Sequence, residues 1–276
     1  MSYEDYHVHT TFSDDSVYEM EEVVKDAISK GMNEICFTDH VDYGIKLDWD
    51  EGKEIEYRDG MPLANVDYPK YFDKIKELRK KYPQITLKQG MEFGMQVHTI
   101  DCYQKLYDRY DFDFIILSCH QVEDKEFWTQ DFQRGRTQRQ YNERYYQEIL
   151  DVITKYKDYS VLGHLDLIVR YDEKGVYPFE KLKPIITKIL KQVIADGKGI
   201  EVNTSSHRYG LSDLQPSRAI LKLYKELGGT IITIGSDSHK KEHLGAYIQD
   251  TKEELKKLGY THYCTFDKMK PIYHEL

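Results

Sequence analysis

The sequence has no apolar run near the roughly 18 residues that a transmembrane helix needs. Its first residues, MSYEDYHVHT, have neither the charged region nor the apolar region of a signal peptide. The four cysteines form no CxxC pair, so we expect reduced thiols rather than a disulfide framework. These absences predict a cytoplasmic protein that does not act at a membrane.

The chain also lacks an excess of positive charge. It carries 39 Lys and Arg against 48 Asp and Glu, a formal net charge of −9 with histidine neutral. Because nucleic-acid backbones reward clustered Lys and Arg, this balance argues against a protein built mainly to coat nucleic acid. It is compatible with a local basic pocket, and it leaves the oligomeric state open.

A regular alternation of short apolar runs and amphipathic stretches is present instead. The apolar runs predict strands at residues 5–9, 33–38, 85–92, 113–120, 159–164, 199–204 and 230–237, with a last one at 262–266. Helical spacing is found at residues 18–30, 69–81, 99–110, 137–156, 178–196, 216–227 and 251–258. Several strands are apolar on both faces, as buried parallel strands are.

Seven β-α units without a break in composition predict one α/β domain over residues 1–276. The expected architecture is a closed, TIM-barrel-like parallel sheet, and the alternative is an open doubly wound sheet. Two long connections, at about 41–68 and 121–136, carry little clear pattern. Both follow strands, so we expect both to rise from the C-terminal face of the barrel. Such loops are usually either functional lids, which could close over a small substrate, or disordered insertions.

Imidazoles and carboxylates gather at the predicted strand ends. They are His7, His9, His40, His120, His164, His239, Glu92 and Asp237. In a parallel barrel these ends share one face, so residues far apart in sequence would line one cavity. A single histidine at a strand end is more often a hydrogen-bonded structural residue, but six of eleven in this position favour a metal site. Nitrogen and oxygen ligands without thiolate fit Zn, Mn or Fe.

Seven motifs in this order resemble the polymerase and histidinol phosphatase family, and more narrowly its free-standing phosphatases. They are HVHTTFSDDS, FTDH, GMEFG, SCH, GHLDL, EVNTSSHR and GSDSH, and they extend from residue 5 to about residue 245. The resemblance implies a distorted (β/α)7 barrel with three divalent metal ions at the C-terminal ends of its strands. The seven strand units counted above agree with it.

The resemblance also implies three sets of metal ligands. These are His7, His9, Glu92 and Asp237 for one ion, Glu92, His120 and His164 for a second, and Asp15, His40 and His239 for a third. Glu92 would bridge the first two ions. The SDDS segment offers both Asp14 and Asp15; we choose Asp15, because some relatives have a histidine at that position, eight residues after the first. An aspartate there leaves the identity of the third metal open.

The implied reaction is hydrolysis of a phosphomonoester by a hydroxide that bridges two of the ions. Asp237, Glu92 and His239 are the expected catalytic residues, and either Asp237 or metal-activated water would protonate the leaving group. For the phosphate, Arg208 is the first candidate because a guanidinium fork matches phosphate oxygens, and Lys240 is the second. His207 could touch the substrate, but solvent exposure is an equal alternative.

The substrate that this resemblance implies is a small molecule, L-histidinol phosphate, in histidine biosynthesis. Acidic loop residues such as Asp42 or Glu123 could meet the ammonium group of an amino alcohol, although a solvated loop is the default for each. Alternatives keep the metals and act on another phosphomonoester or on nucleic-acid ends, or have no activity and serve as a metal-binding regulatory module. The acidic balance argues against a nucleic-acid substrate, and the filled ligand positions argue against an inactive module.

Overall fold

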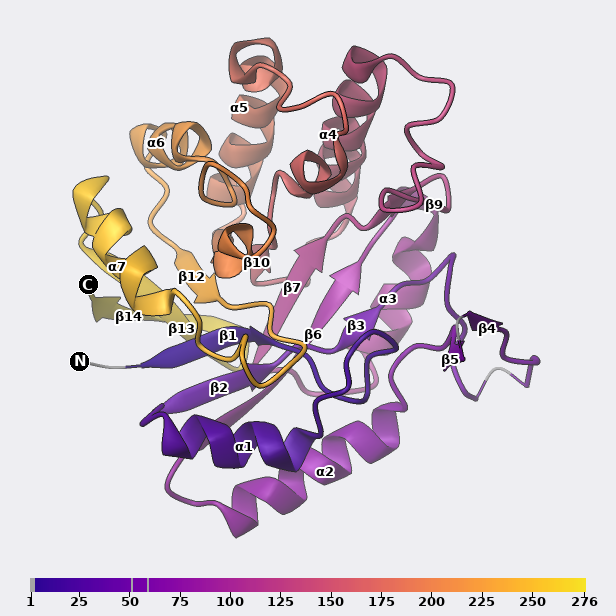
Figure 1. The fold of residues 1–276 in the computed structure, drawn as a ribbon, viewed down its shortest axis with the longest axis vertical. Helices are drawn as coiled ribbons and strands as arrows, with labels where there is room; N and C mark the ends of the chain where they lie inside the picture. The colour runs from indigo at the N-terminus through magenta and orange to yellow at the C-terminus, as the bar shows by residue number, and fades with distance from the viewer. Residues whose placement is uncertain (1–2, 51, 59) are drawn as a thin grey trace.

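The computed structural model describes residues 3–50, 52–58 and 60–276, and its centre is a parallel sheet (Figure 1). The strands follow in the order β1 (Glu4–Val8), β2 (Glu34–Phe37), β6 (Thr86–Gly94), β7 (Phe114–Ser118), β10 (Val161–Leu162), β11 (Gly199–Asn203) and β12 (Ile232–Gly235). A short strand, β3 (His40–Val41), continues beyond β2 and also pairs with β6.

The sheet closes on itself at the C-terminal ends of β1 and β12. The backbone N–H of His9 donates to the carbonyl of Ser238 at 2.9 Å, and the N–H of Ser238 donates to the carbonyl of His7 at 3.2 Å. This bridge between the first and last strands makes the sheet a nearly closed seven-stranded barrel. The predicted barrel is therefore confirmed, and the open sheet is excluded.

Among the described residues, seven α-helices lie outside the sheet, each within three residues of its predicted bounds (Figure 1). They are α1 (Met20–Ser29), α2 (Tyr68–Lys81), α3 (Ile100–Tyr107), α4 (Gln138–Lys155), α5 (Phe179–Ala195), α6 (Arg218–Glu226) and α7 (Ile248–Lys257). The helix starts follow local chemistry: Thr137 and Gln140 form a capping box before α4, and Ser217 caps α6. Short 3-10 helices are η1 (Val97–Thr99), η2 (Leu167–Tyr171) and η3 (Thr204–His207). No helix in the described part of the chain is long and apolar enough to cross a membrane.

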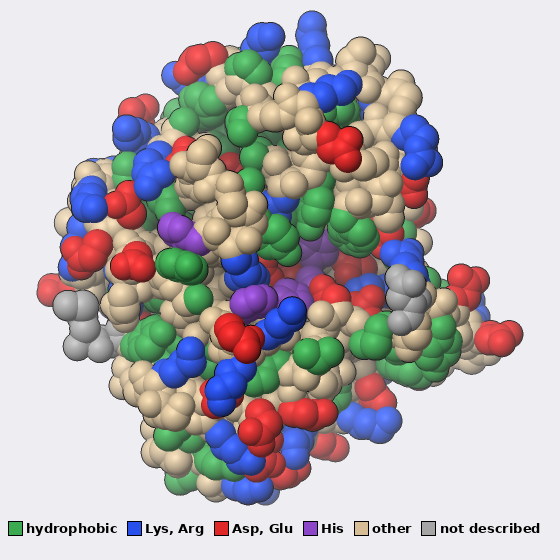
Figure 2. All heavy atoms as spheres, viewed as in Figure 1, with side chains coloured by type: hydrophobic (Ala, Val, Ile, Leu, Met, Phe, Trp, Pro, Cys, Tyr) green, Lys and Arg blue, Asp and Glu red, His purple; other side chains and the backbone are tan. Residues whose placement is uncertain are grey.

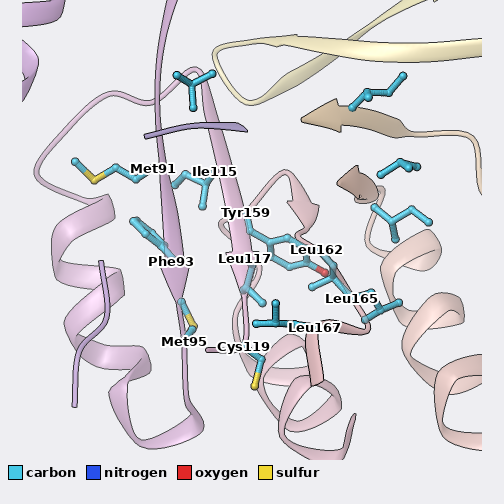
Figure 3. Close-up of a cluster of buried hydrophobic side chains, with 14 of the residues drawn as sticks. Met91, Phe93, Met95, Ile115, Leu117, Cys119, Tyr159, Leu162, Leu165 and Leu167 are labelled. Atoms are coloured by element: carbon cyan, nitrogen blue, oxygen red, sulfur yellow. The ribbon is translucent and has the colours of Figure 1, made fainter. Parts of the chain in front are cut away.

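Alternate residues of the strands face two different cores. On the outer face, Met91 and Phe93 of β6 stand opposite Ile115 and Leu117 of β7 and pack in the larger cluster that includes the helices (Figure 3). The residues that alternate with them in β7, Phe114 and Ile116, belong to a second cluster with Tyr6 and Val161 of other strands. Burial on both faces explains why the strands read as continuous apolar runs.

The N-terminal end of the barrel is closed by a C-terminal hairpin. The predicted strand 262–266 is present as β13 (His262–Asp267), but it pairs antiparallel with β14 (Lys270–Glu275) and lies outside the parallel sheet. Phe266 of β13 joins the second cluster, and its N–H donates to the hydroxyl of Tyr6 at 2.8 Å. The turn residues Lys268 and Met269 both adopt positive φ, 47° and 64°. Two-residue turns of this kind usually have the sequence Asn-Gly, and this chain lacks that pattern here.

Each of the two long connections contains a small hairpin that the sequence did not predict. The first carries β4 (Tyr57–Arg58) and β5 (Met61–Pro62), and the second carries β8 (Gln121–Val122) and β9 (Lys125–Glu126). These strands are two residues long, too short for a periodic pattern to show. Residues of both connections line the same cavity as the histidines, which agrees with a position at the C-terminal face.

Candidate metal centre and substrate cavity

Glu92 of β6 lies at the centre of the C-terminal end of the barrel and is fully buried. Five imidazoles approach its two carboxylate oxygens. Oε2 lies 3.0 Å from His40 Nδ1, 3.1 Å from His7 Nε2 and 3.5 Å from His9 Nε2, and Oε1 lies 2.8 Å from His164 Nε2 and 3.1 Å from His120 Nε2. Each oxygen therefore faces a different group of imidazoles, as a carboxylate that bridges two cations must.

Two further carboxylates extend this cluster. Asp237 Oδ1 lies 3.5 Å from His9 Nε2 and 3.6 Å from His239 Nδ1. Asp15, whose side chain is 52% exposed, places Oδ2 3.2 Å from His239 Nε2 and 3.4 Å from His40 Nε2. Asp14 instead pairs with Lys46 at 2.6 Å. Of the two adjacent aspartates, Asp15 is therefore the one that faces the imidazoles.

Several imidazole nitrogens in the cluster have no hydrogen-bond partner. His9 Nε2, His40 Nδ1 and His164 Nδ1 are buried and unsatisfied, although the first two lie close to carboxylate oxygens. Unsatisfied buried polar atoms are costly, and two of these nitrogens, His9 Nε2 and His40 Nδ1, face the same oxygen of Glu92. Four groups of three ligand atoms lie within 4.8 Å of one another, built from His7, His9, His40, Glu92, His120, His164, Asp237 and His239. The donor set is nitrogen and oxygen only, which suits Zn, Mn or Fe.

The outer nitrogens of three imidazoles are held by neighbouring acceptors. His7 Nδ1 lies 2.5 Å from Glu201 Oε1, His120 Nδ1 lies 2.7 Å from Asp42 Oδ1, and His239 Nδ1 lies 2.9 Å from the carbonyl of Asp237. Such contacts fix the ring and direct the other nitrogen inward, as in many metal sites. The sequence analysis missed Glu201, although a glutamate inside the apolar strand GIEVN was an available signal.

Electrostatic balance differs among the buried groups. Burial by itself raises the pKa of Glu92, but the imidazoles of His7, His120 and His40 outweigh it and hold the pKa well below its usual range. Burial lowers the pKa of His164, which keeps its imidazole neutral. At His120 the carboxylates of Glu92 and Asp42 outweigh burial and raise the pKa to about 9, so a cation bound there would displace a proton.

A cavity of about 570 Å³ opens directly above the cluster, within the usual range for small-molecule sites. Figure 2 shows it as a hollow in which histidine, acidic and basic side chains meet. Arg208 and Lys240, both predicted from the sequence, line it. His207 does not belong to the lining; its ring stacks on Tyr247 with centroids 4.3 Å apart, so its contact with substrate stays a prediction.

Arg170 of η2 is a further cation in this cavity that the sequence analysis missed. Its side chain is only 4% exposed, and its guanidinium contacts Asp237 Oδ2 at 3.3 Å and Gln215 Oε1 at 2.6 Å. Arg208 donates to the carbonyl of Ser236 at 2.7 Å and to the carbonyl of Asp237. No motif marks Arg170, because it belongs to an irregular segment whose position depends on the whole fold.

The loop acids have partners other than those considered from the sequence. Asp42 is buried between Lys46 Nζ, at 2.9 Å, and His120, so its carboxylate orients an imidazole of the cluster. Glu123 pairs with Arg136 at 2.7 Å and is not part of the cavity lining. The acidic residue that the second loop does place in the cavity is Glu126.

Comparisons with known proteins agree with this geometry. The chain matches the PHP domain family over residues 5–205. It is 30% identical to the histidinol-phosphatase of Lactococcus lactis, covering 96% of this chain and 95% of that protein. It is 27% identical to a probable histidinol-phosphatase of Thermotoga maritima over 97% of both chains.

Solved structures are similar over nearly the whole chain. A crystal structure of histidinol phosphate phosphatase from Lactococcus lactis, in complex with zinc, L-histidinol and phosphate, has a TM-score of 0.82 and 30% identity. It covers 98% of this chain and 99% of that one. A putative histidinol phosphatase from Listeria monocytogenes has a TM-score of 0.70 at 22% identity, covering 89% of this chain and 99% of that one, and supports the fold.

Proposed function

Because the chain belongs to the PHP domain family, we propose that it is a histidinol-phosphatase that hydrolyses L-histidinol phosphate to L-histidinol and phosphate. The observation that carries this proposal is the convergence of five imidazoles on the two oxygens of one buried carboxylate, Glu92, below a cavity with basic side chains. The Lactococcus enzyme, similar over almost the entire chain, was crystallised with zinc and both products.

The ligand sets proposed for three divalent ions are those that the family resemblance implies, and the ligand atoms of one of them, His7, His9 and Asp237, also lie within 4.8 Å of one another. His7, His9 and Asp237 with Glu92 would hold one ion, and His120 and His164 with the other oxygen of Glu92 a second. Asp15, His40 and His239 would hold the third. When bound, such ions neutralise phosphate charge and lower the pKa of water.

The chain's own cations would hold and orient the phosphate. Arg170, Arg208 and Lys240 line one cavity with the imidazole cluster. Arg170 and Arg208 both contact Asp237, so the guanidinium groups are fixed in advance relative to the proposed ligands. Pre-oriented donors of this kind favour the transition state, because they need little reorganisation when phosphate charge spreads.

The test is a substrate panel with the purified protein. L-Histidinol phosphate, an aryl phosphate and single-stranded DNA are supplied at equal concentration, with and without a chelator, and with zinc or manganese restored afterwards. We expect metal-dependent phosphate release with the highest kcat/KM for L-histidinol phosphate. Trimming of DNA, or no turnover of any substrate with any of the ions, would contradict the proposal.

A further inference from the structure

Six carboxylates line the cavity, and five of them are engaged by the site itself. The six are Asp14, Asp15, Asp42, Glu92, Glu126 and Asp237. Asp14 and Asp42 are held by Lys46, while the other three site carboxylates face imidazoles of the cluster. Only Glu126 has a partner outside this network.

Glu126 lies at the end of β9, and its side chain is 8% exposed. Its Oε2 accepts from Nη1 of Arg58, on β4 of the other long loop, at 2.6 Å. Within the part of the chain that the structure describes, Arg58 is the one side chain paired with it. The pair therefore joins the two loops at the cavity and consists of a buried anion and a cation that is 45% exposed.

The two members of this pair differ in what they lose on separation. An exposed guanidinium is well hydrated when it leaves, so the pair itself contributes little to stability. A buried carboxylate needs a cation, because ionised groups without partners are costly in such an environment. Burial accordingly raises the pKa of Glu126, and Arg58 opposes this. Glu126 is thus a place where one cation can replace another.

We propose that Glu126 binds the ammonium group of the substrate, which displaces Arg58 from the carboxylate. This inference rests on the proposed function, since L-histidinol phosphate carries a primary amine beside its phosphate ester. It makes Glu126 a residue that selects amino-alcohol phosphates over phosphates without a cationic group. Arg58 then holds the carboxylate ionised until the substrate arrives.

The surroundings of Glu126 fit the remaining part of such a substrate. Trp128, two residues further along the loop, and Tyr171 of η2 line the same cavity, and their ring centroids lie 6.1 Å apart. Leu167 also lines this region. An aromatic wall next to an acid accommodates an imidazole ring when the neighbouring amine is bound by the acid.

The experiment compares two substrates that differ in the amine alone: L-histidinol phosphate and its desamino analogue, 3-(imidazol-4-yl)propyl phosphate. Wild type, Glu126→Gln and Arg58→Met are assayed for kcat and KM with both, and circular dichroism checks folding. Glu123→Gln is the matched control, because this acid of the same loop pairs with Arg136 outside the cavity lining.

We expect Glu126→Gln to lower kcat/KM for L-histidinol phosphate by about 50-fold or more and to leave the desamino analogue within about threefold. Arg58→Met should raise kcat/KM for the aminated substrate by about two- to fivefold, through KM, because it removes a competing cation. The control should match wild type.

A simple latch between the loops gives a different pattern. In that case Glu126→Gln and Arg58→Met would lower activity together and on both substrates, which would overturn the inference. An unchanged Glu126→Gln variant would overturn it too. These outcomes leave the phosphatase activity of the wild type intact, whereas a wild type inactive on both phosphates would reject the proposed function itself.

Discussion

At the N-terminal end of the barrel, a buried ion pair joins α7 to β1. Lys252 of α7 contacts Glu4 of β1 at 3.1 Å, and both side chains are 5% exposed; Tyr263 donates to the same carboxylate at 2.7 Å. At the C-terminal end, five imidazoles surround one carboxylate, and buried nitrogens stay without hydrogen bonds. Burial is similar at these two places, but one lysine meets one carboxylate at the first, whereas five imidazoles surround one carboxylate at the second.

This difference separates groups that serve stability from groups that are arranged for a ligand. A paired buried charge is complete within the chain, and removing one member leaves the other exposed to the desolvation penalty. Imidazole nitrogens that outnumber the carboxylate oxygens beside them find partners only when cations bind. Variants at the N-terminal end should therefore change the free energy of unfolding, and variants at the C-terminal end should change metal binding and turnover.

The largest effect is expected at the centre of the C-terminal end. Glu92→Gln keeps the volume of the side chain but removes the charge that faces five imidazoles, so kcat/KM for L-histidinol phosphate should fall by about 10³-fold. The bound metal, measured by elemental analysis after gel filtration, should fall with it. Glu34→Gln, a carboxylate at the other end that hydrogen-bonds Tyr6, is the control and should keep both. Full activity of Glu92→Gln would contradict the view that the C-terminal end of the barrel is arranged for metal ions.

The converse prediction concerns Lys252. Lys252→Met removes the cation that contacts the buried Glu4, and the free energy of unfolding should drop by about 3 kcal/mol. Guanidinium denaturation at a fixed free zinc concentration measures this, because bound ions otherwise shift the apparent stability. At a temperature well below the transition, kcat/KM should equal that of wild type. Lys256→Met, on the same helix but paired with the exposed Glu253, should change stability by less than about 0.5 kcal/mol.

A smaller effect is expected when a residue that orients an imidazole is changed. Glu201→Gln weakens the contact to His7 Nδ1, which lies at 2.5 Å, and leaves the inward nitrogen less basic. Affinity for the ions should decrease by about 10- to 100-fold, as is typical for such outer partners. Competition with a chromophoric chelator measures it, and excess zinc should restore turnover. If added zinc fails to restore activity, Glu201 does not act through metal affinity.

Most of the barrel could be predicted from the sequence, because a parallel strand that is buried on both faces consists of a continuous run of apolar residues. The strands and helices were found within a few residues, and the strand ends located the imidazole cluster. The small hairpins of the two loops and β14 could not be found, since two-residue strands and a turn of Lys268 and Met269 carry no pattern.

Some residues of the site could also be recognised in the sequence, and others could not. Histidines at successive strand ends are rare enough to notice, whereas Arg170 and Glu126 belong to irregular segments or short strands, where charged residues are ordinary. Their importance depends on burial beside Asp237 and Arg58, which the fold alone determines. Asp42 illustrates the limit: the sequence predicts a solvated loop residue, with contact to the ammonium group of the substrate as the alternative, and Asp42 is buried against His120 instead.

The smallest predicted effect concerns an ion pair at the N-terminal end in which one member, the acid, is exposed. Lys88 contacts Asp267 of β13 at 2.7 Å, but the Asp267 side chain is 51% exposed, so Asp267→Asn should cost less than about 1 kcal/mol. Lys88 lowers the pKa of Asp267 in the folded protein, and the unfolded state therefore binds its proton more readily. The stability difference between variant and wild type should be constant at neutral pH and should disappear as the pH falls below about 4. A cost equal to that of Lys252→Met would mean that charge pairing, independent of burial, holds this end of the barrel together.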